Sequence, residues 1–200
     1  MRRIIVGITG ATGAVLGVSV LRELKARNDV ETHLVLSRWA RSTIRMEMGL
    51  SVRDVAGIAD VVYGFDQQAA AISSGSFLVD GMVIVPCSMK TLAAIRSGYG
   101  DGLIARAADV TLKERRRLVL VPRETPLSEI HLDNMLALAR MGVRIVPPMP
   151  AFYNNPASVN DIVAHVVTRI LDQFDIESVT AKRWNGPSEQ TASRLKVENI

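Results

Sequence analysis

The chain has 200 residues, of which 48% are hydrophobic and 4% aromatic, enough apolar side chain for one substantial core and most naturally for a single domain. Its one cysteine, Cys87, excludes an intramolecular disulfide framework, and no apolar run reaches the roughly 18 residues that a membrane span requires. The formal net charge of +4 is spread along the chain with few aromatic residues beside it, which argues against a nucleic-acid partner. We therefore expect a cytoplasmic protein with no membrane partner.

Five short apolar runs, rich in valine and isoleucine, alternate with longer segments of helical period. The runs predict strands that are covered on both faces of a parallel sheet, at residues 4–8, 30–36, 82–85, 118–121 and 143–146. The other segments predict helices at residues 14–26, 38–48, 89–95, 127–141 and 158–174. This order predicts a single-domain α/β fold, with a doubly wound, Rossmann-like or flavodoxin-like parallel sheet and helices on both faces. Such sheets bind ligands at the carboxyl ends of their strands.

A glycine-rich turn, GITGATGA, follows the first predicted strand at residues 7–14. Its glycines let the backbone approach a ligand, and the helix that follows offers free N–H groups to a phosphate. The turn is not a strict G-x-G-x-x-G and lacks the lysine of a P-loop, which argues against hydrolysis of ATP or GTP. The second strand is followed by Ser37 and Arg38 rather than an acidic residue, so NADP or a mononucleotide such as FMN fits better than NAD. A tight turn that binds nothing is the alternative.

Two more polar turns follow predicted strands. Residues 86–91, PCSMKT, place hydroxyl groups where they can cap the next helix, bind a ligand, or do both. Residues 122–126, PRETP, place Arg123 beside Glu124. This pair suits either an arginine that binds phosphate and is oriented by the carboxylate, or an ordinary surface ion pair. Thr125 has the pattern of an N-cap that precedes a proline at the first helical position.

The remaining reactive side chains give weaker signals. No cue in the sequence pairs Cys87 with a base, so we do not expect it to act as a nucleophile. The histidines His33, His131 and His165 are isolated from one another and lack a second ligand at metal spacing, so we expect no metal site.

Successive blocks of the chain resemble, in order, the UbiX and Pad-type flavin prenyltransferases over roughly residues 3–184. The blocks are GITGATGA, Ser37, IVPCSMKTLAAI, LIARAADVTLKERRRLVLVPRETPLSEIHLDNMLAL and PPMPAFYNNP. Within the family the nearest likeness is to the small subunits associated with hydroxybenzoate and phenolic acid decarboxylases. Thr12 stands where serine is the family's residue, and Met89 and Lys90 replace smaller residues of many relatives.

The resemblance implies transfer of a dimethylallyl group from dimethylallyl monophosphate to N5 and C6 of reduced FMN, without a metal. It implies that the prenylated FMN serves a UbiD-like aromatic acid decarboxylase and that the chain forms a homo-oligomer, expected to be a dodecamer. Catalytic positions carried over are Thr12, Glu47, Lys113 and Glu124. Contacts to FMN carried over are Gly10, Ala11, Thr12, Ser37, Ser88, Met89, Lys90, Thr91 and Arg123. Contacts to the prenyl phosphate are Arg106, Lys113, Tyr153 and Arg169, and Arg106 matches a residue that acts across a subunit boundary.

Residues 1–176 are then expected to form the FMN-binding domain, and residues 177–200 a tail that contacts a neighbouring subunit. Trp184, in that tail, either folds over a flavin site or anchors the tail to a neighbour. Three other functions stay open. They are a flavin-dependent cysteine-type decarboxylase, disfavoured because no histidine lies beside the glycine turn, an NADP-dependent reductase, and a non-catalytic flavin carrier.

Overall fold

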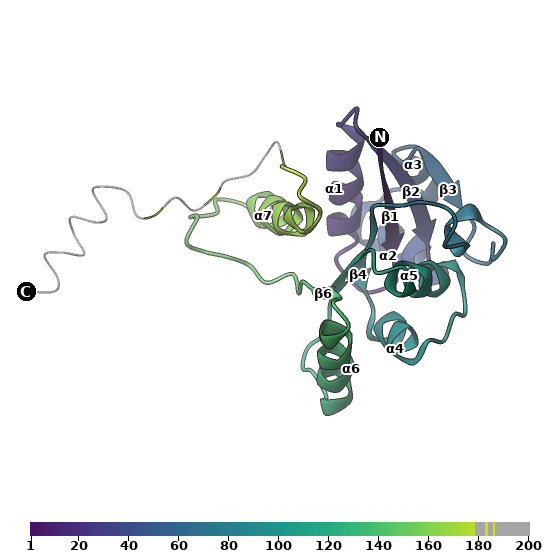
Figure 1. The fold of residues 1–200 in the computed structure, drawn as a ribbon. Helices are drawn as coiled ribbons and strands as arrows, with labels where there is room; N and C mark the ends of the chain where they lie inside the picture. Colours follow the sequence, from purple (N-terminus) through teal and green to yellow (C-terminus); the bar gives the residue numbers. More distant parts are fainter. Residues whose placement is uncertain (179–182, 184–185, 187–200) are drawn as a thin grey trace, which may run out of the picture.

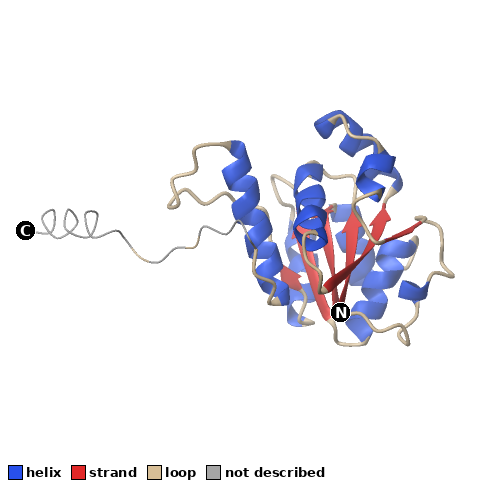
Figure 2. Cartoon of the chain, turned by 90° about the horizontal axis from the view of Figure 1, so that it is seen from above, coloured by secondary structure: helices blue, strands red, loops and turns tan. Residues whose placement is uncertain are grey.

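The computed structural model describes residues 1–178, 183 and 186, and its centre is one parallel sheet. The strand order is β3-β2-β1-β4-β5-β6, and every pairing is parallel. The strands are β1 (Arg2–Ile8), β2 (Val30–Leu36), β3 (Val61–Tyr63), β4 (Gly81–Cys87), β5 (Arg117–Pro122) and β6 (Arg144–Ile145). The chain order reverses between β1 and β4, which makes the carboxyl ends of these two strands the expected ligand site. Figure 2 shows the strands running together between helices, as the doubly wound prediction requires.

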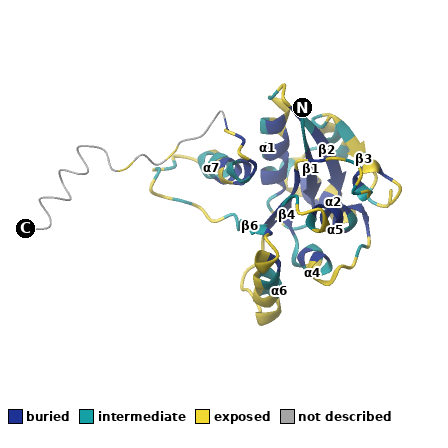
Figure 3. Ribbon diagram, in the orientation of Figure 1, coloured by how far each residue is buried: buried dark blue, intermediate teal, exposed yellow. Residues whose placement is uncertain are grey.

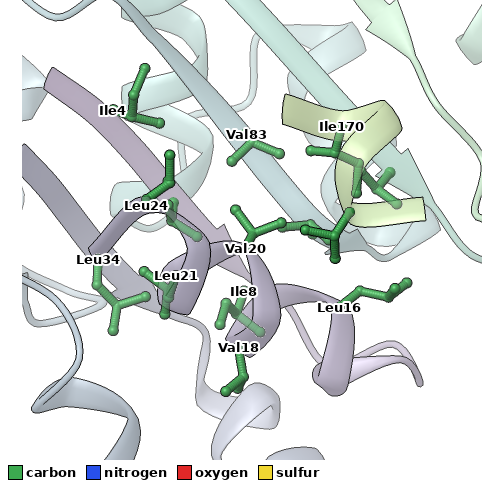
Figure 4. Close-up of a cluster of buried hydrophobic side chains, with 14 of the residues drawn as sticks. Ile4, Ile8, Leu16, Val18, Val20, Leu21, Leu24, Leu34, Val83 and Ile170 are labelled. Atoms are coloured by element: carbon green, nitrogen blue, oxygen red, sulfur yellow. The ribbon is translucent and has the colours of Figure 1, made fainter. Parts of the chain in front are cut away.

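Helices cover both faces of the sheet (Figure 1). They are α1 (Ala14–Lys25), α2 (Arg38–Met48), α3 (Val52–Ala56), α4 (Met89–Ser97), α5 (Leu103–Lys113), α6 (Glu129–Arg140) and α7 (Val159–Leu171), with 3-10 turns at Ala71–Ser73 and Asp172–Phe174. Each face has its own cluster of buried side chains. Figure 4 shows the first cluster, in which Leu21 of α1 and Ile170 of α7 pack with residues of the sheet. The second cluster joins Leu92 of α4 and Ile104 of α5 to the opposite face.

The helix α6 differs from the others because most of its surface is exposed, as Figure 3 shows. Leu138 is its one buried residue. Large apolar side chains on and beside α6 stay exposed, and we call this set the α6 apolar surface: Leu127, Ile130, Leu132, Leu136 and Met141. In the loop that follows β6, Met149 and Phe152 are exposed as well.

The structure adds three elements to those predicted. The edge strand β3 has three half-exposed or exposed residues and α3 has five residues, both too short for a measurable period. The helix α5 was missed although its buried residues, among them Ile104, Ala107 and Val110, recur at the spacing of one helix face.

The predicted start of the helix after β5 was wrong. Thr125 does not cap it: α6 begins at Glu129, and Ser128 is the N-cap. The Ser128 hydroxyl accepts a hydrogen bond from the backbone N–H of His131, and the His131 ring accepts one from the backbone N–H of Ser128. This reciprocal capping box satisfies two donors at the helix start, a stronger device than one threonine hydroxyl.

Two remaining expectations concern the membrane and the tail. Within the described part of the chain, no helix has the length and apolar character needed to cross a membrane. Trp184 and most of residues 177–200 lie outside the described residues, so the division at residue 176 stays a prediction. Ser178, which is described, bonds to the Glu23 carboxylate at 3.0 Å and so lies against α1.

Candidate functional site

A pocket of about 430 Å³ opens at the carboxyl ends of the strands, beside the switch between β1 and β4. It brings together five of the predicted FMN contacts, Gly10, Ser37, Ser88, Lys90 and Thr91. Its other lining residues were not among the predicted site residues: Thr9, Arg38, Trp39, Phe65, Ala94, Tyr99, Asp101, Ile104 and Ala105. The aromatic members come from loops and from the first turn of α2, where neither a motif nor a period marked them.

Buried Thr9 links the two loops that form this pocket. Its hydroxyl donates a hydrogen bond to the carbonyl of Pro86 at 2.7 Å and accepts one from the backbone N–H of Ser88 at 2.8 Å. The backbone N–H of Thr9 also donates to Pro86 at 3.2 Å. The turn after β1 is therefore tied to the turn after β4 by one side chain.

Gly10 is required by the close approach of α2. A Cβ built on Gly10 would lie 2.4 Å from the Cβ of Trp39, far inside van der Waals contact. The space that a larger residue would fill therefore belongs to the first turn of α2. Trp39 itself is 73% exposed and forms part of the pocket wall.

Serine hydroxyls begin the two helices next to the pocket. Ser37 accepts a hydrogen bond from the backbone N–H of Ala40 at 3.1 Å, and Ser88 accepts one from Thr91 at 3.3 Å. The Ser88 and Thr91 hydroxyls lie 3.1 Å apart. Both serines are thus N-caps; Ser37 still has a hydroxyl hydrogen to donate, and the Ser88–Thr91 hydroxyl pair keeps one between them. Capping and ligand binding are compatible here.

The free N–H groups that the sequence predicted at the start of α1 already have an anionic partner. The carboxylate of Glu47, from α2, accepts hydrogen bonds from the backbone N–H of Gly13 at 3.0 Å and of Ala14 at 2.8 Å. It also bonds to the hydroxyl of Thr12. The N–H groups of Gly13 and Ala14 are therefore not free, because a carboxylate from the same chain lies at the positive end of α1, and binding of a ligand phosphate at this turn stays a prediction. Thr12 and Glu47, two predicted catalytic residues, are brought together.

Arg123 follows the pocket on the next strand. Its backbone N–H donates to the carbonyl of Cys87 at 3.2 Å, which places it beside the turn that begins at Ser88. Its side chain is exposed and has no hydrogen bond or ion pair with another described residue, Glu124 included. Glu124 instead accepts from the backbone N–H of Thr125 at 3.2 Å. The interpretation that the Glu124 carboxylate orients the Arg123 guanidinium is wrong for the described structure, because these two side chains do not bond to each other.

Cys87 and two of the histidines have defined surroundings in the structure. Cys87 is fully buried, and burial raises the pKa of its thiol far above the ordinary value, which disfavours the thiolate. His33 bonds to the hydroxyl of Tyr63 at 3.0 Å. His165 bonds to Asn154 at 3.1 Å. Among the described residues, no three histidine, cysteine, aspartate or glutamate side chains gather at metal spacing.

Arg106 and Lys113 bond to residues outside the pocket of their own chain. The α5 helix begins at the pocket wall with Ile104 and Ala105 and runs toward the start of β5. Arg106 donates to the carbonyl of Ser73 at 3.2 Å and pairs with Asp109 at 2.7 Å. Lys113, the last residue of α5, pairs with Glu114. Neither basic residue lines the pocket.

Arg169 lines a second hollow, of about 530 Å³, between the region of β6 and α7. Its lining shares no residue with the first pocket: Arg144, Ile145, Val146, Pro147, Met149, His165, Val166, Arg169 and Gln173. Arg169 pairs with Asp172 at 2.8 Å. The ring of Tyr153 meets the ring of His165 edge to face at 5.8 Å, so Tyr153 and Arg169, two of the four predicted prenyl phosphate contacts, lie in the same region.

Comparison with known proteins agrees with this geometry. The Flavoprotein family model matches residues 1–171. A protein of Streptomyces sp. (strain D7), described as a probable UbiX-like flavin prenyltransferase, is 71% identical over 92% of this chain and 92% of its own. The dodecameric FMN-dependent UbiX-like decarboxylase of Escherichia coli O157:H7 is 64% identical and superposes with a TM-score of 0.92 over 92% of this chain and 100% of its own.

A further solved structure, AnUbiX (PadA1) in complex with FMN and dimethylallyl pyrophosphate, is 57% identical. Its TM-score is 0.91, over 94% of this chain and 99% of its own. The match with the family model and the identity to these relatives extend over nearly all of the described fold. The chain therefore belongs to the Flavoprotein family and, within it, to the UbiX-like flavin prenyltransferases.

Proposed function

We propose that the chain transfers a dimethylallyl group from dimethylallyl monophosphate to N5 and C6 of reduced FMN. The observation that carries this proposal is the pocket at the switch between β1 and β4, which presents hydroxyl, ammonium and backbone donors beside an aromatic wall. Reduced FMN supplies the nucleophilic nitrogen and carbon when it is bound. The transfer would balance as follows: the allylic C–O bond of the donor breaks and phosphate leaves with the bonding electron pair, the double bond of the donor takes up one proton as the bond to C6 forms, and N5 and C6 each release a proton.

The lining residues fit a flavin mononucleotide on two grounds. Gly10 lets the turn after β1 pack directly against the first turn of α2, which holds Trp39 in the pocket wall. Lys90 has no hydrogen bond or ion pair with another described residue, and the hydroxyls of Ser37, Ser88 and Thr91 face the same pocket. An ammonium group among hydroxyl donors suits a phosphate monoester. Because Glu47 occupies the start of α1, the phosphate of FMN belongs with Lys90, Ser37 and the start of α4.

The other carried-over roles are assigned on the family's pattern. Arg123 stands beside Ser88, where its guanidinium can reach an anion at the pocket. The carboxylate of Glu47, which bonds to Thr12, would accept or hold a proton at the flavin. Tyr153 and Arg169 would bind the leaving phosphate and stabilise the charge that grows on it. Ala11 and Met89 would contribute backbone contacts, and Glu124 a second carboxylate.

We further propose that the complete site is formed by a homo-oligomer, expected to be a dodecamer like the E. coli relative. Three observations support assembly. The α6 apolar surface is exposed in the single chain. Arg106 and Lys113 do not line the pocket of their own chain, and Arg169 lines a separate hollow. A subunit arrangement that brings these cations to a neighbour's pocket accounts for all three, and light scattering of the purified protein measures its size.

The product is proposed to serve a UbiD-like aromatic acid decarboxylase in the cytoplasm.

The decisive assay mixes the protein anaerobically with reduced FMN and dimethylallyl monophosphate and detects prenylated FMN by mass. Parallel reactions with dimethylallyl pyrophosphate, the compound in the AnUbiX complex, identify the preferred donor. Reactions in EDTA should proceed at the same rate, because no metal is proposed.

The same preparation separates the alternatives. FMN binding without turnover would indicate a flavin carrier. Oxidation of NADPH would indicate a reductase, and release of CO2 from a peptide ending in cysteine would indicate a cysteine decarboxylase. Activation of a flavin-free UbiD-like decarboxylase by the product tests the recipient.

A further inference from the structure

A third hollow, of about 400 Å³, lies between α2 and α3 and belongs to neither of the sites described above. We call it the arginine hollow, and it is lined by Arg41, Ser42, Arg45, Leu50, Ser51, Val52 and Arg53. Three of its seven lining residues are arginines, and none is acidic. No lining residue is shared with the flavin pocket or with the hollow around Arg169.

The three guanidinium groups have no partner in the described part of the chain. Neither a hydrogen bond nor an ion pair joins Arg41, Arg45 or Arg53 to any described residue. This is unusual for the neighbourhood, because Arg38, on the same helix, pairs with Asp66 at 2.8 Å. Between residues 38 and 53 the sequence has four arginines and one glutamate, and that glutamate, Glu47, is held by the start of α1.

The carboxylate nearest in sequence to the hollow is also engaged. Asp54 accepts a hydrogen bond from the backbone N–H of Ser51 at 2.7 Å, in the capping box of α3. Arg53 contributes to holding the pKa of Asp54 below its ordinary value, after the larger effect of the hydrogen bonds from Ser51. Asp54 does not line the hollow. Its charge therefore offsets only part of the positive potential there.

Like charges so placed destabilise a fold unless an anion neutralises them. Arg41 and Arg45 are four residues apart on α2 and so lie on one face, where two cations repel. Arg53 adds a third cation from α3 across the same hollow. Guanidinium groups bind phosphate oxygens in pairs of parallel hydrogen bonds, and the hydroxyls of Ser42 and Ser51 add donors of the kind that complete a phosphate site.

We infer that the arginine hollow binds a small phosphate-bearing anion, either inorganic diphosphate or a phosphate monoester. Leu50 and Val52 add an apolar wall beside the cations, which favours a monoester with a short alkyl group over the inorganic ion. This site is distinct from the one that would hold the flavin and from the one that would hold the leaving phosphate. The inference does not depend on the proposed prenyl transfer.

The test is a calorimetric titration of the FMN-loaded protein with inorganic diphosphate, and separately with butyl phosphate, in a buffer free of phosphate. The double variant Arg41→Gln/Arg53→Gln removes two cations from the hollow. Arg22→Gln/Arg96→Gln is the matched control, because it removes two exposed arginines of α1 and α4 that are outside the hollow. Retained flavin absorbance and unchanged oligomer size in both variants show that the fold is intact.

We expect the control to keep the parent's affinity for the added anion. The affinity of the double variant should fall roughly tenfold or more for each arginine removed. Binding should also weaken as salt is added, because the cations are exposed. Tighter binding of butyl phosphate than diphosphate identifies the monoester, and the reverse identifies the inorganic ion. The inference would be overturned by isotherms that are the same for the double variant and the control, because any binding would then lie outside the arginine hollow. It would also be overturned if neither anion binds.

Discussion

The carboxylate of Glu47 caps the start of α1 by accepting a hydrogen bond from the backbone N–H of Gly13 at 3.0 Å. Gly13 is the N-cap residue of α1, and it has no side chain with which to cap the helix itself; its φ of 99° is one that glycine adopts without strain. A side chain from α2 thus supplies what the local sequence lacks. The same carboxylate reaches the hydroxyl of Thr12, so a helix cap and a proposed catalytic pair are one feature.

Replacing Glu47 with glutamine tests both roles. Glu47→Gln keeps one acceptor oxygen but removes the charge at the positive end of α1, so the unfolding free energy should fall by about 0.3–1 kcal/mol. Prenylated FMN should form much more slowly, while FMN stays bound. Glu129→Gln, at the first residue of α6, is the control, since it removes a helix-start charge far from the pocket. Equal prenylation rates for both variants would exclude Glu47 from the chemistry.

Gly10→Ala should abolish tight FMN binding and lower stability. The added Cβ would lie 2.4 Å from that of Trp39, so the first turn of α2 must move away from the pocket. Overpacking of this kind costs about 1–3 kcal/mol. Gly64→Ala is a suitable control because its Cβ would meet its nearest neighbour at an ordinary 3.8 Å. Flavin fluorescence titration and thermal unfolding of the two variants measure the difference.

Arg123→Ala should weaken FMN binding without disturbing the fold. The side chain is exposed and has no described partner to lose, so the variant removes only a charge-assisted contact to the ligand. The expected loss is about 1.5–3 kcal/mol, or roughly ten- to a hundredfold in affinity. A variant that holds FMN as tightly as the parent would show that Arg123 is an ordinary surface arginine.

Tyr153→Phe and Arg169→Ala should separate flavin binding from chemistry. Both residues lie outside the flavin pocket, so each variant should stay yellow with FMN yet lose most prenyl transfer. Partial rescue by excess dimethylallyl phosphate would indicate binding of the ground state, and little rescue a role in the transition state. If the two residues are only packing and surface charge, stability changes by about half a kcal/mol and the rate does not change.

His33 should make the fold sensitive to mild acid. Burial lowers the pKa of this imidazole below its ordinary 6.5, and Glu31, 3.1 Å from its Nε2, opposes the shift without reversing it. Arg3 and Asp60 act on it in opposite directions, and its Nδ1 bonds to Tyr63. The folded state therefore favours the neutral ring. The associated stability is complete above pH 6.5 and is lost as the pH falls from there through the lowered pKa.

Denaturant unfolding at a series of pH values from 7.5 down to 5 measures this loss. His33→Gln should unfold at lower denaturant throughout but show a flatter dependence on pH in that interval. His131→Gln, which alters only the capping box of α6, should keep the slope of the parent. A parental slope in His33→Gln would assign the acid sensitivity to other groups.

The sequence predicted the long strands and helices well where a hydrophobic pattern is followed directly by a capping residue. The bounds of β2 and α2 agree with the structure to the residue, because an apolar run ends directly at the N-cap Ser37. The pocket at the switch between β1 and β4 was also located, because turns after parallel strands meet at one edge of a sheet. Contacts between distant residues gave no such signal.

Two examples show the limit. The bond between Glu47 and Gly13 joins residues 34 positions apart, and no local pattern distinguishes that glutamate from a solvated one. The aromatic wall around Trp39 forms because α2 approaches the Gly10 turn, a fact about packing rather than spacing. Arg106 and Lys113 do not line the pocket of their own chain, and the arrangement of subunits that would give them their expected roles has no signal in the sequence.

The link that Thr9 forms between the turns after β1 and β4 also bears on how tightly a ligand can bind. Loops that must be ordered by their ligand lose conformational entropy on binding, and affinity falls by that amount. Here a buried hydroxyl has already fixed the two loops to each other. A cofactor that enters this pocket therefore meets a preorganised receptor, and the entropy of ordering those loops is lost when the protein folds rather than when the flavin binds.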